Sequence, residues 1–253
     1  MIASLGMYDP APLQGANDRF WALIREGLRA RGVEAPEALT RGEGAYWPAW
    51  QAPDLVFSQT CGFPFRARLC GQVSLVGTPD YGVEGCAPGY YCSVFVVRSD
   101  DPREGLEAFD GATMAYNEAL SQSGYAAPLA EVARRGIRLR LGPATEAHAL
   151  SALAVAEGRA DIAALDAVTW AVLTENGLAP QGLRAIDRTT PTPALPYIAA
   201  QGADVEATFA AVAEAIAALS ATDRDRLQLR GLIRIPAEDY LAIPTPPPPE
   251  HFG

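Results

Sequence analysis

The chain has 253 residues, about half of them apolar, and a formal net charge of −10 at pH 7. This composition is typical of a globular protein with a sizeable core, and it argues against nucleic acid or an anionic membrane as partner, because no basic stripe could replace counterions. No lysine occurs, which excludes Schiff-base chemistry and a P-loop.

No apolar run reaches the length of a transmembrane helix, so we expect no direct membrane insertion. The segment Met1–Met7 lacks the basic start and long apolar core of a signal peptide. The sequence therefore leaves the compartment open: either the protein is cytoplasmic, or the chain begins at a mature N-terminus.

The predicted elements alternate between strands and helices along most of the chain. The expected strands are residues 2–7, 54–57, 72–77, 90–98, 112–116, 137–141, 161–165, 186–189 and 195–200. The expected helices are residues 17–31, 63–69, 126–135, 146–157, 167–176, 204–219 and 223–229. This order predicts an α/β fold in which each mostly parallel sheet is flanked by helices.

The same order predicts two lobes, one of which interrupts the other. Lobe one is expected at residues 1–90 plus 189–253, and lobe two at residues 91–188. Two extended hinge strands would join them, and such a hinged pair closes over a ligand. The end of the chain, residues 244–253, is a Pro-rich tail without a core signal.

The stretch Asn117–Tyr125 links a predicted strand to a predicted helix and contains small hydroxyl residues and glycine. A helix start presents free backbone N–H groups and partial positive charge, which together make an anion site without a cationic side chain. The alternative is that Ser121 and Ser123 only cap the helix.

Ligands of open parallel sheets bind beyond the carboxyl ends of the strands, so we read the candidate residues from those ends. Tyr91 is added because neighbours on a strand face opposite sides, so that one of Tyr90 and Tyr91 should face the cleft. The ligand-binding candidates are Tyr8, Ser58, Gln59, Thr60, Tyr91, Asn117, Ser121, Gln122, Ser123, Gly124, Tyr125, His148, Asp166 and Trp170.

Several candidates have a purely structural alternative. Ser58, Thr60 and Asp166 could cap helices, and Trp170 could belong to the core. The spacing of the four cysteines, Cys61, Cys70, Cys86 and Cys92, fits no zinc pattern and is compatible with two disulfides or with buried thiols. We expect no metal and no cofactor.

No nucleophile elbow and no dinucleotide fingerprint occur in the sequence. One usable histidine and no clear nucleophile argue against an enzyme. The alternatives that stay open are a small-molecule enzyme that uses Cys61 or His148 and a cytoplasmic ligand-sensing module.

Three segments resemble the phosphonate/phosphite/phosphate-type substrate-binding proteins of ABC transporters. They are residues 54–62, 89–97 and 117–125, followed by His148 and residues 156–170. The resemblance implies a two-lobed periplasmic-binding-protein-like (type II) fold. It also implies that Ser121, Gln122 and Ser123 hold an oxyanion, with His148, Asp166 and an aromatic residue, Tyr8 or Tyr91, beside it.

The resemblance further implies the function. We expect a non-catalytic solute-binding protein that captures a small oxyanion, such as phosphonate, phosphite or phosphate, between its lobes by hinge closure. Its partners would be a small anionic ligand and the permease of an ABC uptake system. The family is periplasmic, and its members are exported.

Overall fold

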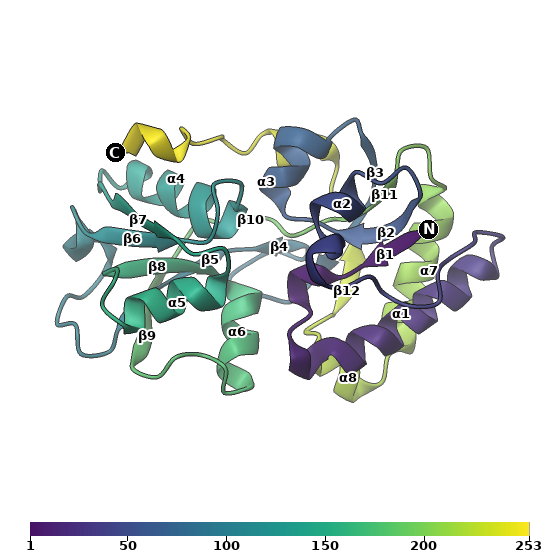
Figure 1. The fold of residues 1–253 in the computed structure, drawn as a ribbon, viewed down its shortest axis with the longest axis horizontal. Helices are drawn as coiled ribbons and strands as arrows, with labels where there is room; N and C mark the ends of the chain where they lie inside the picture. Colours follow the sequence, from purple (N-terminus) through teal and green to yellow (C-terminus); the bar gives the residue numbers. More distant parts are fainter. Residues whose placement is uncertain (253) are drawn as a thin grey trace. The chain divides into compact units, whose positions relative to one another are not determined.

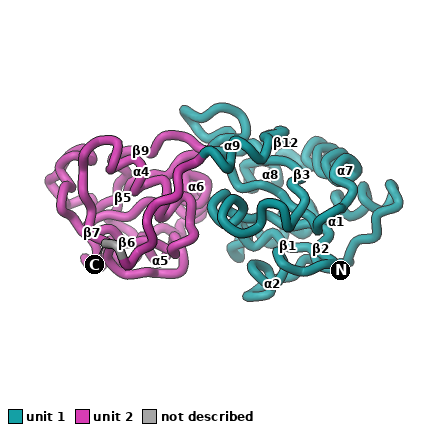
Figure 2. The backbone as a smooth tube through the Cα atoms, turned by 90° about the horizontal axis from the view of Figure 1, so that it is seen from above, with its two compact units in different colours: residues 1–90, 193–242 teal, residues 91–192, 243–253 magenta. Residues whose placement is uncertain are grey.

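The computed structural model describes residues 1–252 and divides the chain into two compact units. Unit 1 contains residues 1–90 and 193–242, and unit 2 contains residues 91–192 and the segment that begins at Ile243 (Figure 2). These boundaries differ from the expected lobes in two places. The chain re-enters unit 1 at Pro193 rather than at residue 189, and the tail belongs to unit 2 rather than to the first lobe.

Unit 1 is built on a five-stranded sheet in the order β1-β2-β11-β3-β12 (Figure 1). The strands are β1 (Ile2–Ser4), β2 (Leu55–Gln59), β3 (Val73–Asp80), β11 (Tyr197–Ala200) and β12 (Gly231–Ile233). β1 pairs with β2 in parallel, whereas β11 lies antiparallel between β2 and β3. β12 pairs antiparallel with β3. The three early strands therefore run in one direction, and the two late strands run against them.

Helices flank this sheet: α1 (Gln14–Arg29), α2 (Trp47–Trp50), α3 (Gly62–Pro64), α7 (Val205–Ala218), α8 (Ala221–Arg226) and α9 (Ala237–Leu241). α1 and α7 lie side by side in Figures 1 and 2, because small residues let their backbones approach. A Cβ atom added at Gly27 would lie 3.0 Å from the Cβ of Ala211. The sheet core is fully apolar at Phe57, Ile198 and Ala199, which have no exposed surface.

Unit 2 has a second five-stranded sheet in the order β7-β6-β8-β5-β9. The strands are β5 (Ser93–Arg98), β6 (Thr113–Tyr116), β7 (Arg140–Ala144), β8 (Ile162–Asp166) and β9 (Leu183–Arg188). β6 pairs in parallel with β7 and β8, and β5 pairs antiparallel with β8 and β9. All strands except β5 therefore run in one direction.

The helices of unit 2 are α4 (Ala127–Arg134), α5 (His148–Ala156) and α6 (Ala167–Glu175). A π-helical turn, η6 (Gln122–Ala126), runs directly into α4, so helical backbone is continuous from Gln122 to Arg134. The short strands β4 (Tyr90–Tyr91) and β10 (Thr192–Pro193) pair with each other where the chain passes between the units.

The α/β fold class predicted from the sequence is confirmed, and the differences concern single elements. The predicted strand 137–141 lies three residues later, because the amide of Ile137 bonds to the carbonyl of Val132 and closes α4. The predicted strand 90–98 is interrupted at Cys92. β12 and α9 have no counterpart in the prediction. The antiparallel pairs of β5 and β11 were also missed, because strand direction is decided by long-range pairing rather than by local pattern.

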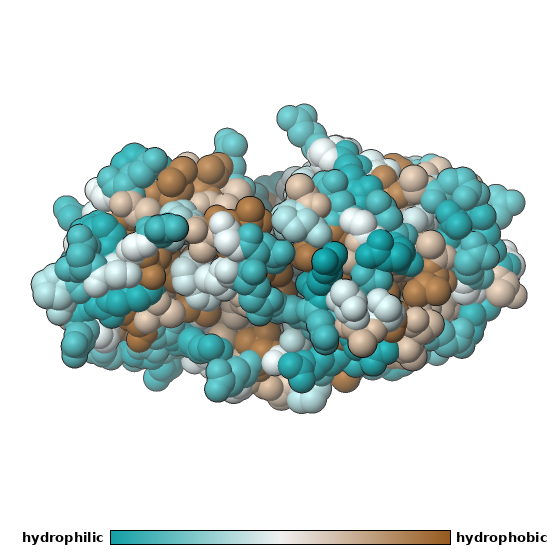
Figure 3. All heavy atoms as spheres, turned by 90° about the horizontal axis from the view of Figure 1, so that it is seen from below, coloured by the Kyte–Doolittle hydropathy of each residue, from teal (hydrophilic) through white to brown (hydrophobic). Residues whose placement is uncertain are grey.

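The described surface is mixed, as Figure 3 shows for one face, where hydrophobic residues alternate with hydrophilic ones. The exposed large hydrophobic residues, including Leu150, Leu178 and Leu241, are scattered along the chain. Among residues 1–252, no helix is both long and apolar enough to cross a bilayer. No disulfide joins any two of the four cysteines, all of which lie in the described part of the chain.

Candidate functional site

The predicted anion site is a helix start in unit 2. Strand β6 ends at Tyr116, and Ser121 takes an extended conformation before the helical backbone begins at Gln122. The hydroxyl oxygen of Ser121 accepts a hydrogen bond from the amide of Gly124 at 2.9 Å. Ser121 therefore caps the helix, as the structural alternative predicted. Its hydroxyl hydrogen is a second bonding group, which an acceptor oxygen could use.

Ser123 points to His148 across this helix start. The Ser123 hydroxyl oxygen and His148 Nε2 are 2.9 Å apart, and Ser123 is 3% exposed. Burial lowers the pKa of His148 to about 4, and the carbonyl of Ala164 opposes this shift only in part. The imidazole is therefore neutral at pH 7, so this helix start offers uncharged hydrogen-bond donors rather than a cation.

The turn before α5 delivers His148 to this place. The amide of Thr145 bonds to the carbonyl of Tyr116 at 2.9 Å, and the amide of Glu146 bonds to the carbonyl of Asn117 at 2.7 Å. Glu146 has a φ of 68°, which is uncommon for a residue with a side chain. Backbone hydrogen bonds thus connect the end of β6 to the residues that follow β7. The strained turn at Glu146 then places His148 at the first position of α5.

Gly124 permits a close approach by Asn117. A Cβ atom at Gly124 would overlap the Oδ1 atom of Asn117, and it would lie 3.2 Å from His148 Cε1. Asn117 Oδ1 is buried and has no hydrogen-bond partner among the described residues. The structure therefore brings Asn117, Gly124, Ser123 and His148 together, as four of the candidates from unit 2.

Tyr125 is oriented differently from its neighbours. Its ring is buried, and its hydroxyl donates to the carbonyl of Pro247 in the tail at 2.6 Å. Burial raises the pKa of this phenol to about 12. Only the backbone of Tyr125 contributes to the helix start, because its side chain is hydrogen-bonded to the tail. Gln122 is 2% exposed and is the first residue of the helical turn.

Asp166 ends β8 and caps α6. One oxygen of its buried carboxylate, Oδ1, accepts from the amides of Val168 at 2.8 Å and Thr169 at 3.0 Å. The capping interpretation of Asp166 is therefore correct for Oδ1. Trp170 lies on α6 one turn later and is half-buried.

Ser93 is a residue that the sequence reasoning missed. It pairs with Asp166 in the ladder between β5 and β8, and it is 1% exposed. Its backbone is bonded to Thr189, but its hydroxyl has no hydrogen-bond partner among the described residues. Cross-strand pairing with Asp166 is the signal that would have found it, and that pairing is not readable from one sequence.

The candidates of unit 1 lie at the end of β2. The hydroxyl groups of Ser58 and Ser4 are 2.7 Å apart, and Gln59 Nε2 donates to the Tyr81 hydroxyl at 2.7 Å and to the Leu195 carbonyl at 3.1 Å. Ser58 and Gln59 therefore hold the sheet of unit 1 together.

The other two candidates of unit 1 are Thr60 and Tyr8. Thr60 is fully buried, and its hydroxyl has no hydrogen-bond partner among the described residues. Tyr8 packs edge-on against Tyr81 with ring centroids 5.2 Å apart. Tyr81 was not among the predicted residues, although it stands beside both Tyr8 and Gln59.

Tyr91 lies in β4 and is 1% exposed. Its neighbour Tyr90 donates from its hydroxyl to the carboxylate of Asp239 at 3.3 Å. The two tyrosines therefore face different surroundings, as the alternation along a strand predicts. Within residues 1–252, no group of three or more His, Cys, Asp or Glu side chains could hold a metal ion.

The fold and the arrangement of these strand ends define the class of protein. The chain has the architecture of the two-lobed periplasmic-binding-protein-like solute-binding proteins. It is similar to XAC2383 from Xanthomonas citri bound to chloride ion, with 17% identity over 96% of each chain and a TM-score of 0.71. It is also similar to PhnD1 from Prochlorococcus marinus in complex with methylphosphonate, with 16% identity over 94% of each chain and a TM-score of 0.70.

A third similar structure is the binding protein component of an ABC phosphonate transporter (PA3383) from Pseudomonas aeruginosa. It has 16% identity, coverage of 95% of this chain and 83% of the other, and a TM-score of 0.61. No curated protein gives a significant match. The family model described as "ABC transporter, phosphonate, periplasmic substrate-binding protein" matches residues 58–239. The chain belongs to this family of substrate-binding components of ABC transporters.

Proposed function

We propose that the protein is a non-catalytic solute-binding protein that captures a small oxyanion of the phosphonate, phosphite or phosphate type. The observation that carries the proposal is the buried helix start at Gln122, where the Ser123 hydroxyl meets the neutral imidazole of His148 at 2.9 Å. Helix starts bind anions through free amides and the helix dipole. Two similar proteins are described with chloride ion and with methylphosphonate.

In this proposal the anion oxygens accept hydrogen bonds from the hydroxyl groups of Ser121 and Ser123 and from amides of the first helical turn other than that of Gly124, which donates to Ser121. When Ser123 turns its hydroxyl hydrogen toward the ligand, the neutral His148 can donate its Nε2–H to the Ser123 oxygen and hold the hydroxyl in that orientation. Because these donors are uncharged, the anion does not have to displace a carboxylate from an ion pair before it binds. The organic side of the ligand would meet the aromatic candidates Tyr8 and Tyr91.

A panel of ligands in a thermal-shift assay tests the proposal. Phosphate, phosphite, methylphosphonate, aminoethylphosphonate and sulfate are compared with a neutral sugar and an amino acid. A ligand at a hundred times its dissociation constant stabilises the folded protein by about 2.7 kcal/mol, which is a readily measured shift. A shift with the neutral compounds and none with any oxyanion would refute the oxyanion proposal.

Variants separate ligand binding from helix capping. Ser123→Ala removes the hydroxyl beside His148 and leaves the cap at Ser121 in place, so we expect weaker anion binding with little change in stability. Ser220→Ala is the matched control, because the Ser220 hydroxyl caps α8 in unit 1 by accepting from the amide of Asp223 at 3.0 Å. This control should lower stability by about 1 kcal/mol and leave anion affinity unchanged.

Closure of the two units over the ligand and delivery to an ABC permease are parts of the same proposal. Closure predicts a smaller radius of gyration in small-angle scattering when the ligand is added. Delivery predicts ligand-dependent stimulation of a cognate ABC transporter. An oxyanion that binds tightly without compaction would contradict hinge closure and leave anion binding intact.

A further inference from the structure

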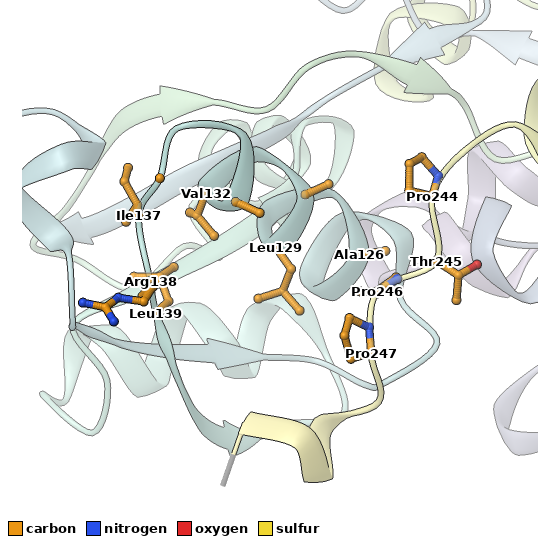
Figure 4. Close-up of a pocket in the computed structure, with 13 residues that line it drawn as sticks. Ala126, Leu129, Val132, Ile137, Arg138, Leu139, Pro244, Thr245, Pro246 and Pro247 are labelled. Carbon is orange, nitrogen blue, oxygen red and sulfur yellow. The ribbon is translucent and has the colours of Figure 1, made fainter.

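A cavity of about 630 Å³ lies in unit 2 between α4, the segment that follows it, and the C-terminal tail (Figure 4). Its walls come from the end of η6 and one side of α4, from the segment Gly136–Leu139, and from Pro244–Pro247 of the tail. The lining residues of the first wall are Ala126 of η6 and Leu129, Ala130, Val132 and Ala133 of α4. A volume of this size is in the range of small-molecule sites. It is separate from the Ser123–His148 contact, because neither of these residues lines it.

The cavity exists because of the size and place of its lining residues. Leu129, Val132 and Ile137 form an apolar floor and are almost completely buried. Ala130 and Ala133 stand on the exposed side of α4, where their short side chains leave the space above the floor unfilled. Apolar walls of this kind provide no hydrogen-bond partners for water, so they favour an apolar ligand.

The tail supplies a rigid second wall. Proline has no backbone N–H and a fixed φ, so a segment with Pro244, Pro246 and Pro247 is extended and presents few polar groups. The hydroxyl of Tyr125 donates to the carbonyl of Pro247 at 2.6 Å and attaches the tail to the start of α4. The wall is therefore formed before any ligand arrives, which lowers the entropic cost of binding.

A positive charge marks one end of the cavity. The stem of Arg138 lines it, and in Figure 4 the guanidinium group points away from the tail segment. The neighbouring Arg134 and Arg135 form ion pairs with Glu131, and Arg135 also with Asp187. Arg138 forms no ion pair with any carboxylate of the described residues, and its side chain is exposed. Of these three arginines, Arg138 is therefore the one that can form an ion pair with an anionic ligand.

We propose that this cavity is a second binding site, which takes a small amphiphile with an apolar chain and a carboxylate head group. The chain would lie on the floor of Leu129, Val132 and Ile137, under the proline wall. The carboxylate would reach the guanidinium of Arg138 at the rim, where a bidentate pair forms without burying an unpaired charge.

Isothermal titration calorimetry with decanoate, below its micelle concentration, tests this proposal on the full chain. We expect saturable binding with a negative heat-capacity change, and at least tenfold weaker binding of decanol, which lacks the charge. Ala133→Leu fills the space above the floor and should weaken decanoate binding at least tenfold. Ala218→Leu, at an exposed alanine of α7 in unit 1, is the matched control and should bind like the wild type.

The head group is tested with Arg138→Gln, which should bring the affinity for decanoate down to that for decanol. Arg226→Gln, at an exposed arginine of α8, is the control for the loss of one charge. Absence of decanoate binding, or binding that Ala133→Leu leaves unchanged, would overturn the proposal. Equal affinities of wild type and Arg138→Gln would overturn the assignment of the carboxylate. Ser123→Ala should not affect decanoate, so this outcome is independent of the oxyanion site.

Discussion

Replacement of Gly124 by alanine should destabilise the protein through a clash that can be relieved at a second position. An added Cβ would overlap Asn117 Oδ1, lie 2.9 Å from Asn117 Cγ, and lie 3.2 Å from His148 Cε1. Gly124 has helical backbone, so alanine itself is not strained there. The overlap costs about 1–3 kcal/mol, and the helix preference of alanine offsets up to about 1 kcal/mol. We therefore expect Gly124→Ala to lose about 1–2 kcal/mol.

The partner substitution identifies the cause. Asn117→Ala removes the overlapped oxygen, which has no hydrogen-bond partner among the described residues, so alone it should change stability little. In the double variant the clash with residue 117 disappears, and most of the stability should return. The coupling energy of the two substitutions is then about 1–2 kcal/mol.

Urea unfolding followed by far-ultraviolet circular dichroism measures the four free energies of unfolding of this cycle. Gly15→Ala in α1 is the matched control, because a Cβ atom there would meet only Arg19 Nη1 at 3.5 Å. It should be neutral or stabilising by up to about 1 kcal/mol. A Gly124→Ala variant as stable as this control, or a coupling energy near zero, would refute the close-packed geometry of the helix start.

Two further predictions concern buried titratable groups of unit 2. Glu131 is 3% exposed, and burial alone would raise its pKa. The hydrogen bonds that it accepts from Arg134, Arg135 and Thr190 outweigh burial and lower the pKa to about 2. Because the pKa in the folded state is below the unfolded value, this stabilisation of about 3 kcal/mol is present above pH 4.5 and is lost as the pH falls toward 2. Glu131→Gln should therefore lose about that amount at pH 7 in urea unfolding, and a loss under 1 kcal/mol would contradict the arrangement. The pKa of His148 is also lowered, to about 4, so the unfolded chain binds its proton first, and wild-type stability should fall between pH 6.5 and 4. His148→Gln should remove that slope, and an unchanged slope would show that another group causes it.

Local sequence pattern predicted most of the helices and strands, and it predicted the stretch in which the helix start of unit 2 lies. Hydroxyl residues and a glycine between an apolar strand and a helix predicted a helix start within Asn117–Tyr125, because capping and backbone conformation depend on neighbouring residues. The helix itself was predicted from residue 126, whereas the helical backbone begins at Gln122, where a π-helical turn precedes α4. The capping interpretation of Ser121 and Asp166 was readable for the same reason. The order of strand, cap and helix along the sequence was sufficient for both.

Only the tertiary structure decided what these residues face. The pairing of Ser93 with Asp166, the contact of Ser123 with His148, and the antiparallel entry of β11 between β2 and β3 join residues far apart in the chain. The tail is a further case: its prolines carry no periodic pattern, yet Pro247 is bonded to Tyr125 and walls a cavity. Such contacts depend on the volume left between elements after packing, and a single sequence contains no local signal for that volume.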